Sequence, residues 1–358
     1  MGDAAPGPAP DDPGQGAPAT LSVSAVVLGC EGPHLGPDEA AFLREADPWG
    51  FILFARNVET PDQLRRLTDD LRAAVGRDAP VMIDQEGGRV QRLRAPHWRE
   101  WLAPLDQVAR SRPGMAARGL WLRYRLIAEE LRAVGIDVDC APVADIAGLA
   151  THPFLANRCL GRDAATVTAA ARAAAEGLLA GGVLPVLKHL PGHGRAVVDS
   201  HHDLPRVAAP LAELETTDFA PFRALADLPV AMTGHIVLDA VDPDRPATAS
   251  AAVIALIREA IGFGGLLLSD DLSMQALSGP IGARAGAAIR AGCDLALHCN
   301  GERDEAAAVV EAAGRLGDAA LRRAAAALAR RDAARPEAID SAALAAELAA
   351  ILSEAAHG

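Results

Sequence analysis

Short apolar runs alternate with longer amphipathic stretches along the chain from Leu21 onwards. The runs are SAVVLG (24–29), GFILF (50–54), VMID (81–84), DVDCAPVAD (137–145), VLPVLKHL (183–190), PVAMTGHI (229–236), GLLLSDDL (265–272) and DLALHC (294–299). Most are too short for helices and are nearly continuous in Val, Ile and Leu. This pattern is typical of parallel strands that are buried on both faces.

The amphipathic stretches between the runs predict helices, which we place at 61–76, 118–135, 164–182, 250–262 and 282–292. Several begin with Pro, Ser or Thr and end on Gly, as helices do. Strand-then-helix units repeated over roughly 280 residues predict an α/β fold with a single TIM-type (β/α)₈ barrel, whose usual length is about 250 residues. A doubly wound open sheet is the alternative. It would need a Gly-rich first turn to bind a nucleotide, and VVLGCEGPHLG (26–36) matches that pattern poorly.

Composition sets the expected domain boundaries. Residues 1–20, rich in Pro, Gly, Ala and Asp, predict a disordered tail that lacks the cationic start and apolar run of a signal peptide. Residues 21–302 form the predicted barrel. Residues 303–358 are Ala-rich and predict C-terminal helices that pack on the barrel, with a break at Arg335–Pro336.

Charge and cysteine usage exclude several classes of protein. The formal net charge is −13 without a long Lys/Arg run, so nucleic-acid binding and a polybasic membrane anchor lack their electrostatic basis. No segment has the uninterrupted apolar length of a membrane helix. We therefore expect a soluble, cytoplasmic monomer with no nucleic-acid or membrane partner. Five scattered cysteines without a CxxC pair predict reduced core thiols; they are Cys30, Cys140, Cys159, Cys293 and Cys299.

Ionisable residues stand where five of the predicted strands run out at their carboxyl ends. They are Asp84, Asp145, Lys188 with His189, His235, and Asp270 with Asp271. Enzymes built on a (β/α)₈ barrel assemble their active sites on this rim. Packing alone does not explain five such strands, so the pattern predicts an active site.

Asp270 and Asp271 are adjacent carboxylates after an apolar strand, in GGLLLSDDLSM (264–274). Neighbouring strand residues point in opposite directions, so we expect one to face the pocket and the other to cap the following helix. A carboxylate on the rim can attack a sugar carbon without first losing a proton.

The loop KHLPGHGRAVVDSHHDLP (188–205) is rich in histidine. Asp199 stands two residues before His201, a spacing that lets the carboxylate fix the imidazole tautomer and raise its pKa, as a general acid/base requires. A metal site is the alternative, but no ligand motif such as HExxH completes it. His193 and His202 are expected to shape the loop and to face solvent, respectively.

Lys188 and His189 end one predicted strand, so one should face the bore and the other the helices. A lysine at that depth needs a carboxylate or a ligand hydroxyl. Asp84, in DQEGGRVQR (84–92), can accept hydrogen bonds from sugar hydroxyls. Arg158 lies on the loop NRCLGRD (157–163), whereas the nearby Arg162 is expected at the surface.

Between about residues 21 and 300 the chain resembles glycoside hydrolase family 3, including its bacterial β-N-acetylglucosaminidases of peptidoglycan recycling. DQEGGRVQR, KHLPGHG followed by DSHxxLP, and SDDLSM occur in the family's order and spacing. The resemblance implies Asp270 as nucleophile and His201, with Asp199 as its partner, as general acid/base. It further implies substrate binding by a set of residues that comprises Asp84, Arg158, Lys188, His189, His235 and Met274. No metal or organic cofactor is implied.

The implied activity is retaining hydrolysis that releases terminal β-linked N-acetylglucosamine from peptidoglycan fragments, namely GlcNAc-1,6-anhydro-N-acetylmuramic acid and its peptides. A phosphorylase is the first alternative, because a histidine acid/base does not repel phosphate as a glutamate would. A non-catalytic sugar-binding barrel is the second, against which Asp270, Asp199 and His201 argue. The chain departs from the family pattern at IAGLATHPFLAN (146–157), at NRCLG, where RSFG is commoner, and at Arg195, where an acidic residue is usual.

Overall fold

Eight parallel strands form a closed barrel in the computed structural model, which describes residues 23–198, 203–334, 336 and 338–353. The barrel strands are β1 (Ser24–Gly29), β2 (Pro48–Leu53), β3 (Val81–Ile83), β6 (Val138–Asp139), β7 (Leu184–Leu190), β9 (Val230–Thr233), β11 (Leu266–Asp271) and β12 (Leu295–His298). Each strand pairs with the one before it in this order, and β12 closes the barrel on β1. The predicted (β/α)₈ fold is confirmed, and the open-sheet alternative is wrong.

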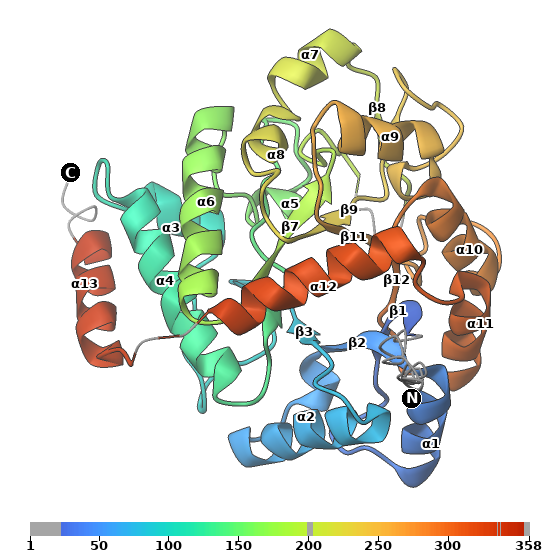
Figure 1. Ribbon diagram of the computed structural model, residues 1–358. Helices are drawn as coiled ribbons and strands as arrows, with labels where there is room; N and C mark the ends of the chain where they lie inside the picture. Colours follow the sequence, from blue (N-terminus) through green and yellow to red (C-terminus); the bar gives the residue numbers. More distant parts are fainter. Residues whose placement is uncertain (1–22, 199–202, 335, 337, 354–358) are drawn as a thin grey trace, which may run out of the picture.

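Helices surround the barrel on its outside (Figure 1). They are α1 (Pro37–Ala46), α2 (Pro61–Val75), α3 (Pro104–Arg110), α4 (Ala116–Arg132), α6 (Ala164–Ala180), α7 (Leu211–Thr216), α8 (Ala220–Ala224), α9 (Ala251–Glu259), α10 (Ile281–Ala291) and α11 (Arg303–Ala313). The five helices predicted from amphipathicity occur within three residues of their expected ends.

Local sequence signals fix α2. The Thr60 hydroxyl accepts a hydrogen bond from the Gln63 N–H, the Gln63 side chain accepts one from the Thr60 N–H, and Pro61 occupies the first turn. Gly76 ends the helix in the left-handed conformation, with a φ of 66°. Leu64, Leu67 and Leu71 recur at helical spacing and are fully buried towards the barrel.

The abundance of alanine has a packing role in α6. Its buried face consists mainly of Ala and Gly, and a Cβ at Gly177 would lie only 2.5 Å from the Trp121 carbonyl oxygen of α4. Small side chains therefore allow α4 and α6 to lie against each other, side by side in Figure 1.

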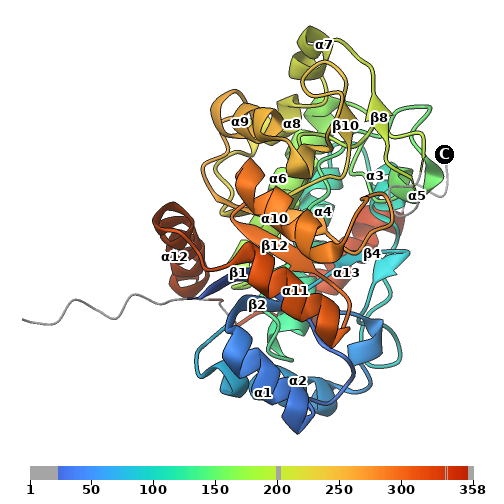
Figure 2. The same ribbon diagram turned by 90° about the vertical axis from the view of Figure 1, so that its right-hand side faces the viewer.

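Short elements elaborate the carboxyl ends of the strands. The antiparallel pair β4 (Gln85–Gly87) and β5 (Val90–Gln91) follows β3, and α5 (Pro153–Ala156) follows β6. The strand β8 (Arg206–Val207), after β7, pairs with β10 (Val237–Leu238), after β9. Two 3₁₀ turns complete this end, Ala55–Asn57 and Ala247–Ala249. Figure 2 shows β4, α5, β8 and β10 together on one side of the molecule.

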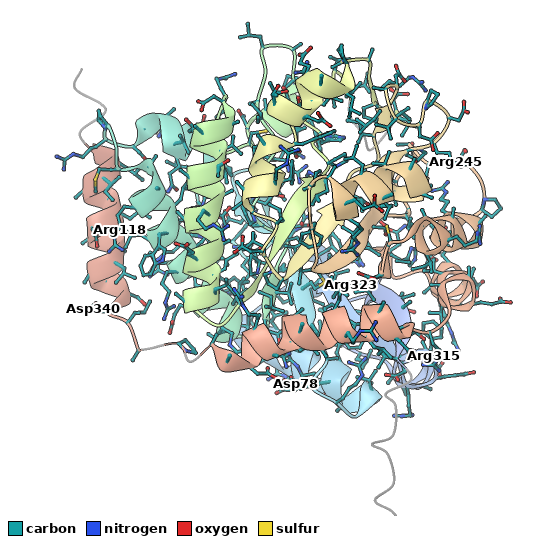
Figure 3. The ribbon with its side chains drawn as sticks, turned by 45° about the horizontal axis from the view of Figure 1, so that its top comes forward. Asp78, Arg118, Arg245, Arg315, Arg323 and Asp340 are labelled. Carbon is teal, nitrogen blue, oxygen red and sulfur yellow. The ribbon has the colours of Figure 1, made fainter. Side chains whose placement is uncertain are left out.

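Helix α12 (Asp318–Ala333) lies across the opposite end of the barrel (Figure 1). Arg323, labelled in Figure 3, pairs with Asp294 at 2.5 Å, directly before β12. Arg331 pairs at 2.8 Å with Asp137, directly before β6, and at 2.8 Å with Asp78. Ion pairs thus connect α12 to the amino ends of β12 and β6.

Helix α13 (Ser341–Ser353) packs beside α4, where Arg118 binds both carboxylate oxygens of Glu347 at 2.7 and 2.8 Å (Figure 3).

The expected tail at residues 1–20 lies outside the described residues. All five cysteines are buried and free, as predicted. In the described part of the chain, no helix has the length and apolarity needed to cross a membrane.

Candidate active site

A cavity of about 200 Å³ opens at the carboxyl ends of the barrel strands. Loops after β2, β3, β6, β7, β11 and β12 contribute to its lining. It brings together six residues that the sequence analysis selected, Asp84, Arg158, Lys188, His189, Asp270 and Met274. Side chains far apart in sequence therefore meet at the rim where barrel enzymes hold their active sites.

One side of the cavity is a cluster of paired charges, which we call the floor and define as Asp84, Glu86, Arg92, Arg158 and Lys188. The Lys188 ammonium lies 2.9 Å from Asp84 and 2.7 Å from Glu86. Arg158 donates to both Glu86 oxygens at 2.9 and 2.8 Å, and Arg92 donates to Asp84 at 3.0 Å. Each buried charge is thus matched by an opposite one.

Ion pairing keeps the floor ionised. Burial by itself would raise the pKa values of both carboxyls, but Lys188 and the arginines more than offset it, so the pKa of Asp84 is lowered and that of Glu86 falls to about 2. Burial alone would lower the pKa of Lys188 and of Arg158, and the same carboxylates raise both. At neutral pH the floor is a fixed set of donors and acceptors suited to sugar hydroxyls.

Lys188 and His189 both line the cavity, so the prediction that one would face the helices is wrong. The reason is a change of register between β7 and β9 at Leu187 to Leu190. Such an irregularity interrupts the strict alternation of a strand and redirects side chains.

Asp145 orients His189 and the following loop. Its Oδ2 lies 2.7 Å from His189 Nδ1, and its Oδ1 accepts the His193 N–H at 2.6 Å. Burial alone would raise the pKa of Asp145, but His189 and His193 outweigh burial and lower it. The ionised carboxylate favours a proton on Nδ1 of His189, leaving Nε2 directed to Arg158 at 3.4 Å.

His193 also lines the cavity, and its Nδ1 has no hydrogen-bond partner among the residues that the structure describes. Burial lowers the pKa of His193 to about 4, although Asp145 and Asp270 oppose that effect. Its imidazole is therefore neutral at pH 7. Within the described ranges, no three His, Cys, Asp or Glu side chains are grouped so as to hold a metal ion.

Asp270 and Asp271 have different environments at the end of β11. Asp271 accepts hydrogen bonds from the backbone N–H of Ser273 at 3.0 Å, from the Ser273 hydroxyl at 2.6 Å and from the Cys299 N–H at 3.2 Å. One of the pair was expected to face the pocket and the other to cap a helix, but both border the cavity. Asp271 stabilises a turn instead of capping a helix, because α10 begins only at Ile281.

Asp270 receives one hydrogen bond, at 2.8 Å, from the Asp271 N–H, and no side chain among the described residues donates to it. Burial would raise the pKa of Asp270, but His235, His189, the Asp271 N–H and Lys188 together lower it. Asp270 is thus an ionised, half-buried carboxylate that borders the cavity.

His235 is fully buried and does not border the cavity. Its Nδ1 lies 2.8 Å from the Thr248 hydroxyl, and its Nε2 lies 2.9 Å from the Asp271 carbonyl oxygen. These bonds tie β9 to the end of β11 and hold the backbone that carries Asp270. Met274, by contrast, borders the cavity and is 8% exposed.

Asp199 and His201 lie outside the described residues. The described base of their loop is anchored by Arg195, which pairs with Asp218 at 2.8 Å and with Glu213 at 2.7 Å. The arginine noted as a departure from the family pattern therefore connects this loop to α7 and the residues that follow it.

Sequence reasoning missed Glu86 and Arg92 of the floor and two residues at the edge of the cavity, Arg89 and Phe154. Glu86 follows Asp84 by two residues, a spacing that puts side chains on the same side of an extended chain. That spacing was the available signal for Glu86. Arg89 comes from the turn between β4 and β5 and Phe154 from the short helix α5, and neither carries a comparable signal.

Asp139 is a fully buried carboxyl on β6 whose surroundings include the floor. Its Oδ1 accepts the Gln85 N–H at 2.9 Å, and its Oδ2 has no hydrogen-bond partner in the described part of the chain. Burial raises the pKa of Asp139 to about 7, with Asp84 and Glu86 acting in the same direction and the Gln85 N–H and Lys188 opposing them.

We predict that Asp139→Asn stabilises the protein more at pH 8 than at pH 5. The pKa of Asp139 in the folded state exceeds its unfolded value of 3.8. At a pH between the two values the folded chain therefore holds one more proton than the unfolded chain, and the wild type loses stability as pH rises towards 7. Asparagine does not titrate. Between pH 5 and pH 8 the free energy of unfolding of the variant should therefore rise by about 2 kcal/mol relative to that of the wild type. Urea unfolding at both pH values measures the gain. Asp69→Asn, at an exposed position of α2, is the control; an equal wild-type-to-variant difference at both pH values for Asp139→Asn would contradict the prediction.

The comparisons with known proteins agree with this geometry. Residues 35–330 match the Glycosyl hydrolase family 3 N terminal domain. The Beta-hexosaminidase of Alkalilimnicola ehrlichii is 39% identical over 285 residues, which cover 77% of this chain and 80% of the relative. The Beta-hexosaminidase of Methylococcus capsulatus is 40% identical over 276 residues, covering 75% and 80%, respectively.

Solved structures show the same relationship. Native NagZ from Neisseria gonorrhoeae has a TM-score of 0.76 at 30% identity, with 93% of this chain and 98% of that chain covered. A glycoside hydrolase family 3 beta-N-acetylglucosaminidase from Paenibacillus sp. str. FPU-7 has a TM-score of 0.81 at 28% identity, with 92% and 67% covered. The chain is therefore a glycoside hydrolase that belongs to glycoside hydrolase family 3, as its motifs predicted.

Proposed function

We propose that this glycoside hydrolase is a retaining exo-β-N-acetylhexosaminidase that releases terminal β-linked N-acetylglucosamine. The observation that carries the proposal is Asp270, an ionised carboxylate without a side-chain partner among the described residues, at a cavity with a charged floor. The names of the relatives, Beta-hexosaminidase and beta-N-acetylglucosaminidase, support the sugar specificity.

Asp270 is proposed to attack the anomeric carbon and form a covalent glycosyl–enzyme intermediate. Its lowered pKa means that no proton must be removed before attack. His201, with Asp199, is proposed to protonate the departing oxygen and then to deprotonate the water that releases the sugar, giving net retention. Retaining sites hold their two catalytic groups roughly 5 Å apart, which sets where the His201 imidazole must lie during reaction.

The floor is proposed to bind the hydroxyls of the terminal sugar. Asp84 offers carboxylate oxygens, whereas Lys188, Arg158 and Arg92 offer N–H donors, and their mutual ion pairs fix these groups before substrate arrives. The cavity of about 200 Å³ is smaller than the roughly 300–1,000 Å³ of pockets for drug-sized ligands. This size favours one sugar residue, as exo-cleavage requires.

The natural substrates are proposed to be peptidoglycan fragments in which N-acetylglucosamine is linked to 1,6-anhydro-N-acetylmuramic acid or its peptides. We predict faster cleavage of such fragments than of chitobiose, and free N-acetylglucosamine as the product both with and without phosphate. Chromatography coupled to mass spectrometry measures both the rate and the product. Formation of N-acetylglucosamine 1-phosphate would assign a phosphorylase instead, and binding without turnover of any β-N-acetylglucosaminide would assign a non-catalytic barrel.

A further inference from the structure

Arg123 is a fully buried arginine that does not border the cavity. It belongs to α4, on the outside of the barrel. Its Nη1 donates to the side-chain oxygen of Gln107 in α3 at 2.9 Å, and its Nη2 donates to the backbone carbonyl oxygen of Glu86. Arg123 thus connects two outer helices with the hairpin of β4 and β5, which carries Glu86 into the floor.

The surroundings of Arg123 are unusual for a buried cation. Both of its hydrogen-bond acceptors are neutral, and its Nε has no hydrogen-bond partner in the described part of the chain. Burial accordingly lowers the pKa of this side chain, and Tyr124, Asp139 and Glu86 only partly oppose that effect. A buried cation without a paired anion costs free energy that an apolar side chain of similar length would avoid. Packing alone therefore does not explain an arginine at this position.

Glycine at position 87 makes the contact with the hairpin possible. Gly87 directly follows Glu86 and has a φ of 101°, in the region that favours glycine. A Cβ on Gly87 would overlap Nη2 of Arg123 and would lie 2.8 Å from the Leu102 carbonyl oxygen. The backbone of the hairpin therefore lies directly against the guanidinium, with no room for a side chain between them.

Glu86 is held at both its carbonyl and its carboxylate. Arg123 binds the carbonyl, whereas the carboxylate lies 2.7 Å from the Lys188 ammonium and 2.8 Å from the Arg158 guanidinium. The carbonyl contact fixes the backbone from which the carboxylate reaches these two cations. A shift of the hairpin would lengthen both ion pairs and release Lys188 and Arg158, which line the cavity.

We propose that Arg123 is a positioning residue, which holds the hairpin so that Glu86 keeps its place in the floor. Through Glu86 it fixes Lys188 and Arg158 for contact with the terminal sugar. The inference rests on the proposed function and adds a residue that acts on the floor without touching the substrate. The floor contacts the sugar both before and during the reaction, so loss of Arg123 weakens binding more than it slows the chemical step.

Arg123→Met tests the proposal, because it keeps the length of the side chain and removes both hydrogen bonds. With an aryl β-N-acetylglucosaminide we expect KM to rise about ten-fold and kcat to fall less than about three-fold. Arg123→Lys keeps a donor for the Glu86 carbonyl and should raise KM only about three-fold. The thermal unfolding midpoint shows whether each variant is folded.

A double-mutant cycle with Glu86→Gln separates positioning from a general loss of stability. Because Arg123 acts through the Glu86 carboxylate, Arg123→Met should change KM less than about two-fold when residue 86 is already glutamine. Arg331→Met is the matched control, because it also removes a buried arginine, one that pairs with Asp137 at the opposite end of the barrel. It should lower the unfolding midpoint and leave KM unchanged.

The outcomes distinguish the inference from the proposed function. An unchanged KM in both Arg123 variants, or an equal rise in KM with and without Glu86→Gln, would overturn the inference alone. If Arg123→Met does not fold, Arg123→Lys replaces it in the cycle, and its rise of about three-fold should disappear beside Glu86→Gln. Absence of turnover by the wild type would overturn the proposed function, and the inference with it.

Discussion

Replacement of Asp270 by asparagine is expected to lower kcat for an aryl β-N-acetylglucosaminide by about 10⁴-fold, equivalent to about 5 kcal/mol of activation free energy. The amide keeps the size of the side chain but cannot form the covalent intermediate. The lowered pKa of Asp270 and its position beside the cavity support its proposed role as the nucleophile. Initial rates measure the loss, and the thermal unfolding midpoint checks that the variant is folded.

Asp271→Asn is the matched control, because the two carboxylates are adjacent and of the same chemistry. It weakens the bonds to Ser273 and to the Cys299 N–H and should cost about 1–2 kcal/mol of stability, with a far smaller effect on kcat. Azide should restore turnover of Asp270→Gly by forming the α-glycosyl azide, because it replaces the missing nucleophile. Loss of kcat that is equal in the two asparagine variants, or a β-glycosyl azide, would assign the nucleophile elsewhere.

The barrel was predictable because each strand can be recognised from its own apolar sequence. A parallel strand covered on both faces must be apolar at nearly every position. The strands β2, β3 and the first half of β11 show this in their own sequences, without any knowledge of their neighbours. Helix α2 likewise carries its own start at Thr60 and its own end at Gly76. Such local signals repeat around the barrel, and chain order then gives the topology.

The family resemblance indicated Arg158 and Met274, which line the cavity. The hydrophobic pattern itself predicted site residues only where they stand directly at the end of a strand. Asp84, Lys188 and Asp270 satisfy that condition. Glu86 does not, because it follows the end of β3 within a hairpin that the hydrophobic pattern does not indicate. Its pairing with Arg158, 72 residues later, depends on how two loops fold over the barrel, and no local pattern encodes that contact.

Alternation along a strand failed as a rule for Lys188 and His189, because β7 changes register at this point. His235 shows a different limit of sequence analysis. A polar residue at a strand end was expected to face the pocket, but the His235 imidazole does not border the cavity and bonds to the Asp271 carbonyl oxygen. The position of His235 at a strand end placed it near the site. The direction of its side chain depended on Thr248 and Asp271, which only the fold brings next to it.

Lys188→Met is expected to lower the free energy of unfolding by about 3–5 kcal/mol at pH 7, because it leaves two buried carboxylates facing each other with one positive charge fewer. Lys188 is also the only lysine in the chain. A compact ammonium can bridge Asp84 and Glu86 at 2.9 and 2.7 Å, which a larger planar guanidinium would not reproduce, so Lys188→Arg should restore only part of the lost stability. Urea unfolding of the three proteins gives the values.

The pH dependence separates this electrostatic effect from a simple loss of packing. The pKa values of Asp84 and Glu86 are lowered in the folded protein. The contribution of these two carboxylates to stability is therefore complete above about pH 4.5 and is lost as pH falls through their folded-state pKa values. Lys188 is the largest cause of the lowered pKa at Asp84 and, after Arg158, the second largest at Glu86. The difference between wild type and Lys188→Met should therefore be greatest near pH 7 and shrink as pH falls below about 4.5. A difference that stays constant from pH 7 down to about pH 2.5 would mean that Lys188 acts through packing, and the floor would then not be held by its charges.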